Sequence, residues 1–142
     1  MRRVSLCTIS ALVLLSGAWA AGVSAHGAHG AQGAQGNPEA AKMKNPVAKS
    51  AESVAAGKAL YTKNCRFCHG NEAKGNGPMA PKDTHPSDLT DAKWDRGSTD
   101  GEIFAVIRDG AGPKFDMKGY KSKMSETDIW NVVNYLRSIG PK

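Results

Sequence analysis

The sequence is short of the residues that build a large hydrophobic core. Among 142 residues there are three tryptophans, three tyrosines and three phenylalanines, and 40% of the chain is hydrophobic. With only three cysteines, it cannot be a small domain held together by several disulfides. The length corresponds to one domain with a tail, which excludes a large enzyme with a deep pocket of its own. Collagen, coiled-coil and multi-span membrane compositions are also absent.

Charge is missing from one stretch, Val4–Ala25, which follows Arg2 and Arg3 and ends in small residues. A basic start, an apolar middle and a small-residue end predict a signal peptide over residues 1–25, cleaved on export. The alternative is an uncleaved N-terminal segment that tethers the chain to a membrane. With cleavage we expect a periplasmic protein without stable membrane insertion. Cleavage lowers the formal net charge from +6 to +4, because it removes Arg2 and Arg3 and no acidic residue.

The rest of the chain divides into a leader and a domain. Residues 26–51 are rich in Gly, Ala and Lys and have almost nothing to bury, which predicts a flexible leader. Residues 52–142 contain three helical patterns: about 52–64, then 99–110, then 125–140, the last two opening with capping-box spacing. The intervening segments are rich in Gly and Pro and predict loops. The fold class is all-α, and a large buried cofactor would supply the core that the loops lack.

Five consecutive residues, Cys65-Arg66-Phe67-Cys68-His69, identify that cofactor. Two thiols at this spacing add to the two vinyl groups of haem, and the adjacent histidine supplies the proximal iron ligand. A zinc site would need a second pair of ligands, and a thioredoxin-like pair would follow a strand. A structural disulfide would leave His69 without a role. The motif therefore predicts one covalently attached haem c, with Cys65 and Cys68 as thioethers and His69 on the iron.

Two further positions complete the expected site. His69 needs a partner for its other ring nitrogen, and a carbonyl near Pro78 is placed to accept that hydrogen bond. The distal iron ligand is expected to be Met117, in a loop ahead of the last helix. The alternative is Met124, at the edge of that helix, where an apolar residue usually packs.

From Glu52 to its end the sequence resembles the class I bacterial monohaem cytochromes c. The resemblance implies the small cytochrome c fold, with three main helices and long loops wrapped around one haem. It also implies a first and a last helix that cross at a glycine contacting an aromatic residue, a methionine as sixth ligand and a proline carbonyl behind the histidine. The segments that carry it are Ala56–Tyr61, Cys65–His69, Gly77-Pro78, Pro86–Thr90, Trp94, Gly97–Ile103, Met117–Tyr120, Ser125–Trp130 and Val133–Arg137.

The resemblance assigns roles to several residues. Gly57 and Tyr61 would form the crossing with Tyr135 or Leu136, and Met117 and Pro78 would take the ligand and carbonyl roles. Trp94 and Arg96 lie where such proteins hold a haem propionate. The family commonly has proline after the ligand methionine. Here Lys118 follows Met117, so we expect a looser Met–iron bond or competition from Met124.

His/Met ligation fills both axial positions of the iron, which suits an electron carrier and leaves no place for a substrate. We therefore expect periplasmic electron transfer, as a free carrier or as a subunit of a redox complex, with no catalytic residue. The alternative is an open-iron haem enzyme or gas sensor, peroxidase-like, if the methionine is labile. The small basic excess does not indicate nucleic-acid binding. Redox partners with acidic surfaces would dock at the lysines around Met117, namely Lys114, Lys118, Lys121 and Lys123.

Overall fold

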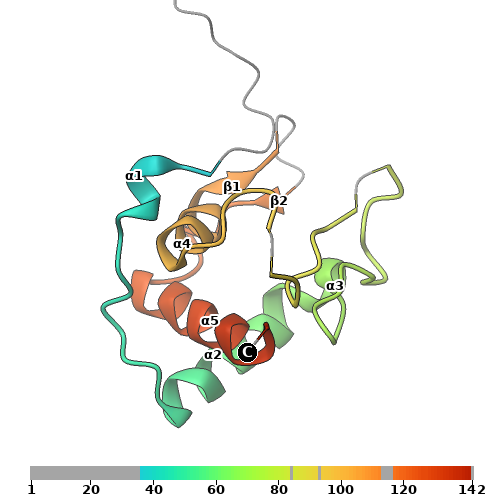
Figure 1. Ribbon diagram of the computed structural model, residues 1–142. Helices are drawn as coiled ribbons and strands as arrows, with labels where there is room; N and C mark the ends of the chain where they lie inside the picture. Colours follow the sequence, from blue (N-terminus) through green and yellow to red (C-terminus); the bar gives the residue numbers. More distant parts are fainter. Residues whose placement is uncertain (1–35, 84, 93, 113–116, 142) are drawn as a thin grey trace, which may run out of the picture. The chain divides into compact units, whose positions relative to one another are not determined.

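The computed structural model describes residues 36–83, 85–92, 94–112 and 117–141 (Figure 1). This part of the chain is mostly helical with one small sheet, in agreement with the expected all-α class. The predicted signal peptide lies outside the described residues. No helix within those residues has the length and apolarity needed to cross a membrane. The elements are α1 (Pro38–Ala41), α2 (Ala51–Asn64), α3 (Arg66–His69), α4 (Asp100–Asp109), β1 (Gly110–Ala111), β2 (Met117–Lys118) and α5 (Glu126–Ile139).

Capping by nearby side chains sets where α4 and α5 begin. The hydroxyl of Thr99 accepts a hydrogen bond from the amide of Glu102, whose carboxylate accepts from the amide of Thr99 in return. Ser125 and Asp128 form the same reciprocal pair at the start of α5. Gly110, with φ of 93°, ends α4 in a conformation that side chains disfavour. These boundaries confirm the two capping boxes expected from the sequence.

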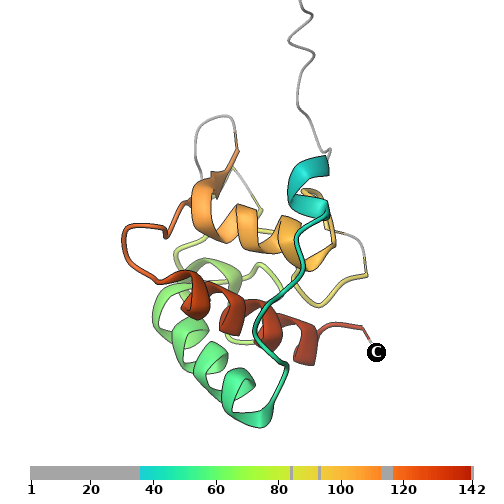
Figure 2. The ribbon, with the colours of Figure 1, turned by 90° about the vertical axis from the view of Figure 1, so that its left-hand side faces the viewer.

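Helices α2 and α5 cross in direct contact, and both ribbon views show them side by side (Figures 1 and 2). At the crossing Gly57 leaves no room for a side chain, since a Cβ there would lie 1.9 Å from the carbonyl oxygen of Asn131. The rings of Tyr61 and Tyr135 meet next to it, with centroids 5.3 Å apart and planes tilted by 52°. The glycine–aromatic crossing implied by the resemblance is confirmed, with Tyr135 as the aromatic partner.

Helix α4 also packs against α5 and completes the core. The rings of Phe104 and Trp130 stack with centroids 4.1 Å apart and planes within 15°. Aromatic side chains bury a large area each, so these two stacked rings and the Tyr61–Tyr135 pair are major parts of the buried core. The aliphatic part of the core comes from the same helices and includes Ile103, Ile107, Ile129, Val132, Val133 and Leu136.

The structure corrects the flexible leader expected over residues 26–51. Its second half, residues 36–50, which we call the strap, is folded onto α4 and α5, whereas residues 26–35 lie outside the described part (Figure 2). Ala40 is 4% exposed, and a Cβ on Gly101 would lie 1.9 Å from its carbonyl oxygen. The amide of Asn134 donates to the backbone oxygen of Val47, 3.1 Å away. Ala40 and Val47 are too far apart to form a periodic pattern, and the other contacts named here use backbone and amide groups, so the sequence carries no helical or strand signal for this docking.

Strands β1 and β2 are two residues each and pair antiparallel, with Gly110 opposite Lys118 and Ala111 opposite Met117. Such short strands are too brief to show an alternating pattern, and the sequence predicted only loop here. Their effect is to hold the segment around Met117 against the end of α4.

Candidate functional site

A cavity of about 780 Å³ opens between the helices and the loop that connects α3 to α4. The two cysteines, both free thiols, and the histidine of the Cys-x-x-Cys-His motif line it. Much of its wall is aliphatic, which suits a large apolar macrocycle. The residues present therefore fit a haem, because thiols, imidazoles and thioethers line one largely apolar cavity. Its aliphatic lining residues are Leu89, Ile103, Val106, Ile107, Val132 and Leu136.

The motif is presented by the end of α2 and the single turn of α3. Helix α2 ends at Asn64, and its C-cap is Cys65, whose amide donates to the carbonyl of Tyr61 at 2.8 Å. The amide of His69 donates to the carbonyl of Cys65 at 2.9 Å, which closes one helical turn. Residues three and four apart share a helix face, so this turn places Cys65, Cys68 and His69 side by side. Gly70, with φ of 82°, then ends the turn.

The ring of His69 is oriented by a backbone carbonyl. Its Nδ1 lies 3.2 Å from the carbonyl oxygen of Ser87, and because a carbonyl only accepts, Nδ1 carries the hydrogen. Burial lowers the pKa of His69, and the Ser87 carbonyl acts in the opposite direction. The neutral imidazole keeps the lone pair of Nε2 free for a metal ion.

This contact corrects the expected role of Pro78. The amides of Gly77 and Met79 donate to the backbone of α3, at Cys68 and Phe67, which holds Pro78 in a different, smaller hollow. The chain then returns, and the amide of Leu89 donates to the carbonyl of Ala73 at 2.7 Å. That return brings Ser87 to His69. Ser87 belongs to the Pro86–Thr90 segment that carries the family resemblance, but no local signal distinguishes one backbone carbonyl from another.

The structure separates the two candidate methionines. Met117 is half-buried in β2 and lines the cavity. Met124 is 8% exposed, belongs to the hydrophobic core and is not among the residues that line the cavity. The two sites differ because β2 faces the cavity, whereas the turn before α5 directs Met124 into the core.

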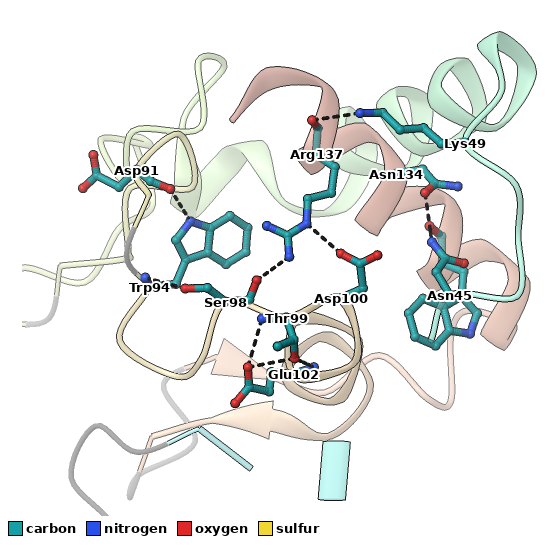
Figure 3. A network of polar contacts seen from close by, with 11 residues as sticks. Asn45, Lys49, Asp91, Trp94, Ser98, Thr99, Asp100, Glu102, Asn134 and Arg137 are labelled. Carbon is teal, nitrogen blue, oxygen red and sulfur yellow. Dashed lines mark hydrogen bonds and ion pairs between the residues drawn. The ribbon is translucent and has the colours of Figure 1, made fainter. Parts of the chain in front are cut away.

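Trp94 and Arg96 both line the cavity, and a polar network holds their loop (Figure 3). The indole N–H of Trp94 donates to the carbonyl of Asp91 at 2.8 Å, so it is already engaged within the loop. Arg137, near the end of α5, donates to the carbonyl of Ser98 and to the carboxylate of Asp100. The sequence predicted Arg137 only as a helix-end residue, since its partners lie 37 and 39 positions away.

The described lysines that follow Met117 are exposed, and one of them lines the cavity. Lys118 is exposed and lines the cavity, and Lys123 lies over the ring of Tyr120, 5.9 Å from its centroid. Lys121 is also exposed, with its ammonium 3.8 Å from the carboxylate of Asp109. Lys114 lies outside the described residues.

Comparison with known proteins gives a family model and curated relatives. The model described as cytochrome c oxidase, cbb3-type, subunit III matches residues 52–136. The cbb3-type cytochrome c oxidase subunit FixPc of Rhizobium leguminosarum bv. viciae is 34% identical over 86 residues, which are 60% of this chain and 27% of that protein. Cytochrome c550 of Pseudomonas aeruginosa is 33% identical over 100 residues, which are 68% of this chain and 62% of that protein. The chain thus spans about a quarter of the oxidase subunit's length.

Solved structures share the fold. A chain of the reducing HAO-like protein complex of Kuenenia stuttgartiensis aligns with a TM-score of 0.59 at 23% identity, over 70% of this chain and 50% of that chain. Cytochrome cL of Methylophaga aminisulfidivorans aligns with a TM-score of 0.53 at 24% identity, over 64% of this chain and 55% of that chain. At these identities the likeness concerns the fold alone, and it confirms the expected small cytochrome c fold.

Proposed function

The chain belongs to the family described as cytochrome c oxidase, cbb3-type, subunit III, a c-type cytochrome domain with covalent haem c, and on this premise we propose that it transfers single electrons between periplasmic redox proteins. The observation that carries the proposal is that Cys65, Cys68, His69 and Met117 all line one cavity. When bound, the haem supplies a reversible Fe(II)/Fe(III) couple. The two cysteines would hold it covalently, and His69 and Met117 would be the ligands of its iron.

The chain's own residues prepare these roles. The carbonyl of Ser87 fixes the tautomer and orientation of His69. The β1–β2 ladder holds Met117 at the cavity wall, and a thioether ligand favours the reduced iron. With both residues bound, the iron would have no open position for a substrate. A carrier, free or as the electron-transfer subunit of a redox complex, therefore suits the site better than an enzyme.

The ligand assignment is tested by optical spectra of the holoprotein, oxidised and reduced, with and without CO. We expect a low-spin spectrum with the weak far-red band of a methionine–ferric bond and no CO binding. Met117→Leu should abolish that band and admit CO. Met124→Leu is the matched control, because it replaces a buried core methionine by a residue of similar volume and should leave the spectrum unchanged.

Two results would contradict the proposal. If the band survives Met117→Leu and disappears in Met124→Leu, the ligand is Met124. If the wild-type protein is high-spin or binds CO readily, the sixth position is open, and the alternative of a haem enzyme or gas sensor takes precedence.

The proposed docking surface is basic, and it would attract redox partners with acidic surfaces. A double reversal of Lys118 and Lys123 to Glu should slow reduction by the anionic reagent ferrocyanide and weaken the dependence of the rate on ionic strength. The same reversal of Lys58 and Lys63, exposed on α2 and not among the cavity-lining residues, is a control with the same change in net charge. Equal effects of the two pairs would show that net charge alone acts.

Export and haem attachment are tested together by intact mass under denaturing conditions. A mass equal to residues 26–142 plus one haem is expected, since thioether bonds survive unfolding. A mass that includes residues 1–25 would favour the membrane-tethered alternative.

A further inference from the structure

The segment that carries Met117 is held firmly although Lys118 stands where related chains have a stiffening proline. On one side the β1–β2 ladder pairs Met117 with Ala111. On the other side the amide of Tyr120 donates to the carbonyl of Ile107 at 2.9 Å. Gly119 between them packs so closely that a Cβ would lie 2.6 Å from the carbonyl oxygen of Arg108. All of these contacts anchor the segment to α4 and the strand that follows it.

One contact anchors the same segment to a different part of the molecule. The hydroxyl of Tyr120 donates to the carbonyl oxygen of Asn64 at 2.9 Å, across 56 positions of the chain. Asn64 is the last residue of α2 and directly precedes Cys65. The last carbonyl groups of a helix accept no hydrogen bond from within that helix. The hydroxyl of Tyr120 therefore supplies a donor for the carbonyl of Asn64. Tyr120 and Asn64 both line the haem cavity.

We propose that Tyr120 is a positioning residue that couples the Met117 segment to the haem-attachment end of α2. The inference rests on the proposed function, because it concerns Met117 as the distal ligand. With the hydroxyl in place, the segment cannot move away from Cys65 without breaking a hydrogen bond at the cavity wall. Without it, the segment is held on the α4 side alone, and the state with the thioether displaced becomes more populated.

The test compares Tyr120→Phe with the wild-type holoprotein, using imidazole as a probe that competes for the distal position of the ferric protein. The net contribution of one hydrogen bond between uncharged groups corresponds to about a five-fold change in an equilibrium constant. We expect Tyr120→Phe to bind imidazole about five-fold more tightly than the wild type does. The substitution removes one oxygen and keeps the ring that packs in the cavity.

Tyr61→Phe is the matched control. The hydroxyl of Tyr61 is buried, lines the same cavity and donates to the carbonyl of Gly70 at 2.6 Å, next to His69 and away from the Met117 segment. It should lower global stability about as much as Tyr120→Phe while leaving imidazole affinity unchanged. If Tyr120→Phe binds imidazole like the wild type, or if both variants bind it equally tightly, the positioning role is refuted.

Failure of the proposed function is distinguished by Met117→Leu. A methionine–ferric band that is absent from the wild type, or that persists in Met117→Leu, refutes the ligand and with it this inference. If the band is lost in Met117→Leu and Tyr120→Phe binds imidazole with the same affinity as Tyr61→Phe, only the positioning role is refuted.

Amide exchange of the wild-type holoprotein tests the inference without a variant. The amides of Tyr120 and Lys121 should exchange as slowly as those of α5. Exchange as fast as in exposed loops would overturn the inference.

Discussion

Replacing Gly57 by alanine should destabilise the protein, because this residue sets the distance between α2 and α5. A Cβ at this position would lie 1.9 Å from the carbonyl oxygen of Asn131 and 2.9 Å from the Cβ of Tyr135, where ordinary contacts begin at 3.4 Å. The obstructing oxygen belongs to the backbone of α5, so it cannot rotate away as a side chain would. The two helices must separate at the crossing.

The magnitude follows from two opposing effects. Alanine is preferred over glycine inside a helix by about 1 kcal/mol. Overpacking costs about 1–3 kcal/mol, and an immobile backbone obstruction places Gly57→Ala near the upper end of that range. The net expectation is a loss of about 2 kcal/mol, which lowers the melting temperature by about 10 °C for a domain of this size.

Urea unfolding of the holoprotein, followed by circular dichroism, measures this loss. The haem stays attached in the unfolded chain, so unfolding is unimolecular. Gly140→Ala is the control, because its Cβ would meet nothing closer than the carbonyl oxygen of Leu136 at 3.3 Å, and its stability should change by less than about 0.5 kcal/mol. The reasoning is refuted if Gly57→Ala is as stable as Gly140→Ala or more stable than the wild type.

Two other perturbations probe the strap and the buried tyrosine. Asn134 is 4% exposed, and its amide nitrogen contacts the carbonyls of Val47 and Ala48 and the hydroxyl of Ser53. Asn134→Ala should lower the free energy of unfolding in urea by about 2 kcal/mol. It should also let trypsin cleave the strap. A strap that resists trypsin as well as in the wild type would contradict the anchoring role of Asn134. Burial raises the pKa of Tyr61 above its ordinary value of 10.0, so its contribution to stability is full below that pH and decreases as the pH rises further. The free energy of unfolding of the wild type should therefore exceed that of Tyr61→Phe by less above pH 10 than below it. A difference that stays constant across that range would show that ionisation of Tyr61 does not affect stability.

The features predicted correctly from the sequence are those whose partners lie within a few residues. Thr99 and Glu102 form a capping box because residues three apart meet at a helix start. Cys65, Cys68 and His69 share a face because one helical turn brings them together. The glycine–aromatic crossing of α2 and α5 was also anticipated, through the resemblance to a family rather than through local chemistry.

The remaining features depend on contacts between distant parts of the chain. Whether the carbonyl of Pro78 or of Ser87 reaches His69 is decided by the hydrogen bond between Leu89 and Ala73, which returns the loop to α3. The strap folds through backbone and amide contacts that leave no periodic pattern, so composition alone described it as a leader.

The sequence by itself determined the covalent cofactor and where α4 and α5 begin, because a thioether motif and a capping box act over one turn of chain. Only the tertiary structure decided which of the two candidate methionines lines the cavity, since Met117 and Met124 are alike as residues and differ in the direction in which β2 and the turn before α5 present them. The same holds for the contact of Tyr120 with Asn64, which exists because β2 and α4 bring the tyrosine back to the end of α2.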